Sequence, residues 1–230
     1  MPKPPADPAA LARQVESIER VARATPPAPS DFMRLGRALR QLSRWMLGTE
    51  DAGQIARAAA VLEDLVGELQ ATKPPPSRFT RELAENPDER LVNAWGKHPL
   101  LGSSHPLAPP IEMRVEPDRL VGDVTFDVRF EGNAGWVHGG FIAAGFDIVA
   151  VQAARLSGRS GPTGTLSVRY LAPTPVGVPL RYEGFFDREA GRKLFTTGQL
   201  LRTDTGAVTA TAETIVIAPA AEARRRSPEP

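Results

Sequence analysis

The sequence predicts an α+β fold in which an antiparallel sheet carries one central apolar helix on its face. Residues 141–151 are apolar all round a helix, apart from Gly145 and Asp147, and a helix without a polar face is typical of an interior. We expect this run to be too short to span a bilayer. On either side of it, residues 111–130 and 163–217 alternate apolar and polar positions, which is the period of half-buried strands.

Length, composition and charge limit which classes of protein this chain can belong to. The chain has 230 residues, enough for one or two domains, and its 41% apolar and 24% charged shares are typical of a globular protein. A net charge of +1 gives no indication of a nucleic-acid partner. With no cysteine and three histidines, disulfides and thiolate metal sites are excluded, and we expect no metal. The first residues contain no apolar signal segment, so we expect a cytoplasmic protein without a membrane span.

The N-terminal part is helical in pattern. Three segments, about 8–24, 31–47 and 50–71, carry apolar residues at helical spacing, and Thr49 is predicted to cap the third. We interpret the arginines of the second segment as a solvated face, and we expect the helices to pack on the main domain or on a second subunit. The predicted organisation is a helical extension, a linker and connecting arm, a sheet-and-helix domain and a disordered tail, at 1–73, 74–110, 111–218 and 219–230.

Within the third of these regions the elements follow from the alternation and the turn residues. A hairpin turns through 116–119 into a strand that is predicted to reach Phe130. A loop, 131–135, leads into the central helix. The remaining strands are predicted at about 163–171, 180–186, 193–202 and 207–217, joined by turns at 172–177, 187–192 and 203–206.

One motif lies at the start of the central helix. The turn His138-Gly139-Gly140 opens the helix, and Asp147 follows the histidine by nine positions, since 147 − 138 = 9. The stretch from Thr163 to Pro173 then gives a threonine, an alternating strand, an aromatic residue and a proline turn. In these features the chain resembles the hotdog fold and, more narrowly, the acyl-CoA thioesterase group typified by the phenylacetate-pathway thioesterase, over about residues 98–217.

The resemblance implies thioester hydrolysis, with Asp147 on the catalytic position as a general base or as a nucleophile. Helix N-termini present unpaired N–H groups, so we propose the Gly140 amide, with Gly139 as second donor, as the oxyanion hole. His138 either holds the turn or touches the thioester, and Thr163 either orients the water or only starts a strand. The resemblance also implies a coenzyme A thioester as substrate, no cofactor, and a homodimer or homotetramer with each site shared across an interface.

The substrate-binding residues are less specific. Asn133, Trp136 and Phe141 could contact the substrate, although a turn role for the asparagine and core packing for the two aromatics are the simpler interpretations. Arg192 and Lys193 could meet the phosphates of coenzyme A or form an exposed basic turn. Two other functions stay open. A hotdog hydratase or dehydratase would carry an aspartate five residues before the histidine, where this chain has Asn133. A non-catalytic acyl-thioester-binding or assembly module is the other.

Overall fold

The computed structural model describes residues 31–70, 99–100 and 105–220. This part of the chain falls into two compact units, divided between Ala108 and Pro109. The helix predicted over 8–24 and most of the connecting arm lie outside the described residues, as does the tail from residue 221.

Among its described residues, the first unit contains two helices, α2 (Asp31–Gly48) and α3 (Ala52–Gln70). The cap predicted at Thr49 is wrong, because α3 begins three residues later and Asp51 takes that position. The Asp51 Oδ1 atom accepts a hydrogen bond from the Gln54 N–H at 2.9 Å. No residue of α3 is buried among the described part of the chain, and its apolar stripe is exposed at Ile55, Leu65, Val66 and Leu69.

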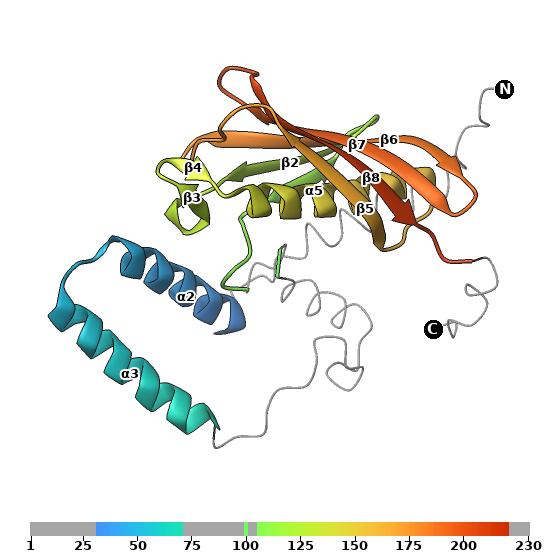
Figure 1. Cartoon of the computed structure of the whole chain (residues 1–230). Coiled ribbons are helices and arrows are strands. Elements are labelled where there is room, and N and C mark those ends of the chain that lie inside the picture. Colours follow the sequence, from blue (N-terminus) through green and yellow to red (C-terminus); the bar gives the residue numbers. More distant parts are fainter. Residues whose placement is uncertain (1–30, 71–98, 101–104, 221–230) are drawn as a thin grey trace. The chain divides into compact units, whose positions relative to one another are not determined.

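The second unit confirms the predicted fold class. Six antiparallel strands form one sheet in the order β1-β2-β6-β7-β8-β5, and helix α5 (Gly139–Ala154) lies along one face of it (Figure 1). The strands are β1 (Glu112–Val115), β2 (Leu120–Thr125), β5 (Thr163–Tyr170), β6 (Pro179–Ala190), β7 (Lys193–Arg202) and β8 (Val208–Ile217). The strand after the helix, β5, forms one edge of this sheet, and β1 forms the other.

Three segments of this unit differ clearly from the prediction. Strand β2 ends at Thr125, because Asp127 caps a short 3₁₀ helix, η2 (Val128–Phe130), by accepting a hydrogen bond from the Arg129 N–H at 3.0 Å. The predicted loop after it contains a small hairpin, β3 (Glu131–Asn133) with β4 (Trp136–Val137). The turn predicted at 187–192 is shorter, since β6 continues to Ala190 through an irregularity in its pairing with β7.

The apolar helix is explained by its burial. Phe146 and Val149 of α5 are almost fully buried in the main core, and Phe146 packs edge-on against Tyr182 of β6 with ring centroids 5.1 Å apart. A Cβ atom added at Gly145 would lie 2.4 Å from the Tyr182 hydroxyl, so only glycine lets helix and sheet approach this closely here. With the 3₁₀ turn η3 (Arg155–Ser157), the run Gly139–Ser157 is long and apolar enough, by length and composition alone, to cross a membrane. The expectation that it was too short is therefore wrong, and packing on the sheet accounts for its composition.

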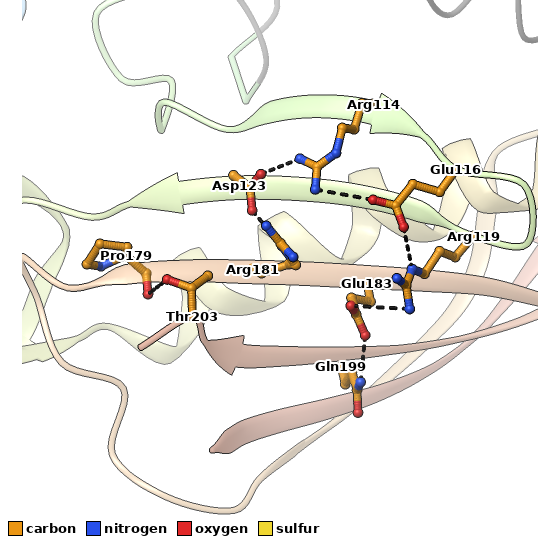
Figure 2. A network of polar contacts seen from close by, with 9 residues as sticks. All are labelled: Arg114, Glu116, Arg119, Asp123, Pro179, Arg181, Glu183, Gln199 and Thr203. Atoms are coloured by element: carbon orange, nitrogen blue, oxygen red, sulfur yellow. Dashed lines mark hydrogen bonds and ion pairs between the residues drawn. The ribbon is translucent and has the colours of Figure 1, made fainter. Parts of the chain in front are cut away.

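The opposite face of the sheet is charged. Arg181 and Glu183 alternate along β6 with residues that face the helix, so they project to the other side. They join a chain of ion pairs and hydrogen bonds across β1, β2, β6 and β7 (Figure 2), with Arg114, Glu116, Arg119, Asp123 and Gln199. Burial alone would raise the pKa of the Asp123 carboxyl, but hydrogen bonds from Arg181 and Arg114 outweigh it and lower that pKa overall. This network therefore connects β1, β2, β6 and β7 on the face of the sheet opposite α5.

Candidate active site

The first turn of α5 is capped by the histidine of the predicted motif. His138 has extended backbone (φ −62°, ψ 131°), and its Nδ1 atom accepts a hydrogen bond from the Gly140 N–H at 3.0 Å. Its own N–H donates to the Phe130 carbonyl at 2.8 Å, which anchors the turn to η2. Its carbonyl accepts from the Phe141 N–H at 2.9 Å. The imidazole therefore accepts the hydrogen bond of the Gly140 amide, which is the amide predicted to stabilise an oxyanion.

The peptide group between Gly139 and Gly140 is held at both ends. The Tyr170 hydroxyl, at the end of β5, donates to the Gly139 carbonyl oxygen at 2.8 Å. That carbonyl and the Gly140 N–H belong to one planar peptide group. The Gly139 N–H has no hydrogen-bond partner within the described residues. The turn thus presents one unpaired amide and one that is paired only with a side chain.

Asp147 lies in the middle of the helix. It is half-buried, and within the described ranges its carboxylate makes no hydrogen bond or ion pair. It belongs to the less buried stripe of α5, which runs from the exposed Gly140 through Ala144 to Asp147 and Val151. The spacing of seven residues (147 − 140 = 7) is close to two full turns, so both ends of this stretch share a face, about 10 Å apart along the axis.

Thr163, Arg192 and Lys193 lie at the other end of the sheet from this turn. The register pairs Thr163 with Val216 and Lys193 with Ile217, whereas Tyr170, beside the turn, pairs with Ala210. The Thr163 hydroxyl is buried without a hydrogen-bond partner in the described structure. The Arg192 Nε atom donates to the Ala218 carbonyl at 2.9 Å, so this side chain already supports the backbone, while Lys193 is exposed. One copy of the chain does not bring these residues to its own first turn.

The three predicted substrate-binding residues near the turn differ in environment. Phe141 packs against the main core, with its ring edge-on to Phe130 at 4.9 Å between centroids. Trp136 is 43% exposed and pairs with Asn133, which is exposed as well, in the β3–β4 hairpin. Phe141 therefore packs against the core, whereas the indole of Trp136 is partly exposed.

Sequence reasoning did not select Tyr170. The sequence pattern nevertheless indicates its position, since Tyr170 ends the alternating strand after the helix and shares the helix-facing side with Leu166 and Val168.

A hollow of about 570 Å³ lies on the other face of the sheet, lined by polar side chains that include Arg169, Gln199 and Glu213. None of the predicted site residues lines it. Within the described residues, no group of three histidine, aspartate or glutamate side chains is placed to hold a metal ion.

Comparisons with known proteins agree with this fold. Residues 134–210, from the turn before α5 into β8, match the family model of the thioesterase superfamily. The crystal structure of a thioesterase superfamily protein is similar to 83% of this chain and 97% of its own, with 28% identity and a TM-score of 0.68. The chain has the hotdog fold.

Two further structures are more distant. Thioesterase superfamily member 2 of zebrafish is 16% identical, over 60% of this chain and 89% of its own, with a TM-score of 0.45. A Streptococcus mutans protein bound to acetyl-CoA is also 16% identical, over 47% of this chain and 88% of its own, with a TM-score of 0.45. No curated protein matches the chain in sequence.

Proposed function

We propose that this protein hydrolyses acyl-CoA thioesters to the free acid and coenzyme A, with Asp147 as the base or nucleophile. The observation that carries the proposal is the half-buried Asp147 carboxylate, which has no hydrogen-bond or ion-pair partner among the described residues. It lies in the stretch that matches the thioesterase superfamily. A partly buried acid without a structural partner is a candidate for chemistry. Amides at the first turn of the same helix supply the second requirement, a site for a developing oxyanion.

These two parts belong to different copies of the chain in our proposal. The first N–H groups of a helix point out of its N-terminus, so an oxyanion on the Gly140 amide lies beyond the end of α5. Asp147 is about 10 Å further along the axis in the opposite direction. A base must come within about 3 Å of the water that attacks the same carbonyl. One helix therefore cannot hold both ends of the reaction, and a second copy supplies the missing part.

The edge strand β5 offers a way to bring two copies together. Its outer edge is unpaired within the described structure, and it contains eight residues without proline. Such an edge is a template for pairing with another chain. Pairing about a two-fold axis perpendicular to the sheet would set the two α5 helices antiparallel on the same side. The stripe of Gly140, Ala144 and Asp147 has small enough side chains for another chain to approach closely.

In this arrangement Asp147 of one copy acts beside the Gly140 amide of the other copy. As a base, it takes a proton from the water that attacks the thioester carbonyl, and the C–S bond breaks to release coenzyme A as the thiolate, which is then protonated. As a nucleophile, it attacks the carbonyl itself, the C–S bond breaks with release of coenzyme A, and water hydrolyses the resulting acyl-enzyme anhydride to the free acid. The carbonyl oxygen of the thioester replaces the His138 Nδ1 atom as the acceptor of the Gly140 N–H. Thr163, with its buried and unpartnered hydroxyl, is proposed to orient the water, and Lys193 to contact the phosphates of coenzyme A.

The test is thiol release from a panel of acyl-CoAs of different chain length and aromatic character. Asp147→Asn keeps the shape of the side chain and removes its basicity, so we expect kcat to fall about 10³-fold, within the range for loss of a general base. Equal rates for Asp147→Asn and wild type would refute the role of Asp147. Hydration of crotonyl-CoA without thiol release would identify the chain as a hydratase instead, and binding without turnover would identify a non-catalytic module.

A further inference from the structure

Both tyrosines of the chain donate a hydrogen bond to a carbonyl of helix α5. Tyr170 donates to Gly139 at 2.8 Å, and Tyr182 donates to Ile142 at 3.1 Å. Their surroundings differ. Tyr182 is fully buried in the core, whereas Tyr170 is 52% exposed at the end of the edge strand. The ring of Tyr170 lies directly against Gly139, since a Cβ atom added there would be 3.1 Å from its hydroxyl oxygen.

The Tyr170 bond acts on a particular peptide group. A donor on a peptide carbonyl withdraws electron density from the amide, which makes the N–H of the same group a stronger donor. The N–H that shares a peptide group with the Gly139 carbonyl is that of Gly140. The Tyr182 bond acts instead on the group between Ile142 and Ala143, whose N–H lies beyond the first turn.

We propose that Tyr170 is a positioning residue for thioester hydrolysis, which holds and polarises the Gly139–Gly140 peptide so that its N–H binds the oxyanion. This inference rests on the proposed function. In the transition state the hydrogen bonds run from the tyrosine hydroxyl through the peptide group to the negatively charged oxygen. A stronger donor stabilises a full negative charge more than the ground-state carbonyl, so Tyr170 acts on kcat and leaves KM nearly unchanged.

The experiment compares Tyr170→Phe with Tyr182→Phe on the acyl-CoA that the wild type hydrolyses best. Each variant removes one hydroxyl bonded to a carbonyl of α5, and Tyr182→Phe is the matched control because its bond lies outside the Gly139–Gly140 peptide. We expect Tyr170→Phe to lower kcat about tenfold with KM within about twofold, because it loses both the orientation and the polarisation of the amide. Tyr182→Phe should keep kcat within about twofold of wild type, since cooperative strengthening acts along one hydrogen-bonded chain.

A second readout is the amide proton of Gly140 by NMR. We expect an upfield shift of this resonance in Tyr170→Phe, because the weaker donor is less deshielded, and no comparable shift in Tyr182→Phe. A wild type that hydrolyses thioesters together with a Tyr170→Phe variant of equal kcat would overturn the role of Tyr170 and leave the proposed function intact. A rise in KM with unchanged kcat, or an unchanged Gly140 resonance, would also overturn it. A wild type without thiol release from any thioester would overturn both proposals.

Discussion

The first turn of α5 and the middle of the same helix are held in place by different interactions. Residues 138–140 are partly or fully exposed, and two polar groups of their backbone, the Gly140 N–H and the Gly139 carbonyl, are paired with the side chains of His138 and Tyr170. At residues 145–150 the helix is buried among apolar residues, apart from Asp147. There its position is determined by close contact with Tyr182. Hydrogen bonds to exposed side chains can be exchanged for bonds to a ligand at little cost, whereas buried packing cannot be rearranged cheaply.

In our proposal, this difference assigns substrate binding to one end of α5 and structural support to its middle. The rigid middle determines where Asp147 and the first turn stand, and the exposed end supplies donors whose partners can change. Because both donor and acid are carried by one rigid helix, their separation of about 10 Å is fixed, and flexibility within one copy cannot close it. The three predictions that follow test this division, first at the site between copies, then in the scaffold, then in the cap.

The largest effect is expected from mixing two inactive variants. Asp147→Asn removes the acid, and Gly140→Val places a β-branched side chain over the approach to its own amide. We expect each variant alone to lose about 10²-fold or more in kcat. In a mixture of equal amounts that exchange subunits freely, half of the dimers are mixed and one of their two sites is intact. Activity should therefore recover to about a quarter of wild type, as expected for symmetric dimers.

The matched control mixes Asp147→Asn with the double variant that carries both substitutions. No mixed dimer then contains an intact site, so thiol release should stay at the level of the single variants. Mixed dimers are identified by two different affinity tags, which ties any recovery to subunit exchange. Recovery only in the first mixture supports a site shared between copies. Mixed dimers without recovery would mean that both groups act within one copy.

The buried middle of α5 could be predicted from the sequence, whereas the hydrogen bonds at its first turn could not. The apolar run around Asp147 and the alternating strands were sufficient to predict the sheet-and-helix fold, because burial requires apolar residues at fixed periods. Strand β7 has the bounds predicted for it, 193–202. The bond from Tyr170 to Gly139 could not be predicted, since it joins residues 31 positions apart through the path of β5. The pairing of His138 with Gly140 is local, but its geometry depends on backbone angles that the sequence does not determine.

The continuation of β6 to Ala190 could not be predicted either, because it also depends on contacts with another strand. Charged residues and Gly191 after Phe186 are typical of a turn, and the sequence pattern was interpreted in that way. The irregularity between Phe186 and Arg188 lets the strand continue in pairing with β7, so the polar residues belong to a long exposed hairpin. Whether a strand ends or bulges depends on its neighbour, which the sequence of one strand does not reveal.

The scaffold prediction compares alanine at two glycines of α5. A Cβ atom at Gly145 would lie 2.4 Å from the buried Tyr182 ring, which has no room to move, and overpacking of this kind costs about 2 kcal/mol of unfolding free energy. A Cβ atom at Gly140 would meet only the exposed imidazole of His138, at 3.0 Å from Nδ1. We therefore expect Gly145→Ala to lower the unfolding free energy by about 2 kcal/mol and Gly140→Ala to change it by less than about 0.5 kcal/mol. Denaturant unfolding measures both, and equal losses would show that the first turn is as tightly packed as the middle.

The smallest effect concerns the cap and separates the two interpretations of His138. Replacing His138 by alanine removes the acceptor for the Gly140 N–H, and loss of an N-cap costs about 1 kcal/mol. Asparagine is a strong N-cap, so His138→Asn should restore the unfolding free energy to within about 0.5 kcal/mol of wild type. If the imidazole only holds the turn, His138→Asn also restores kcat. If the imidazole touches the thioester, stability returns while kcat stays low, and the exposed end of α5 then contributes a side chain as well as its amides to the reaction.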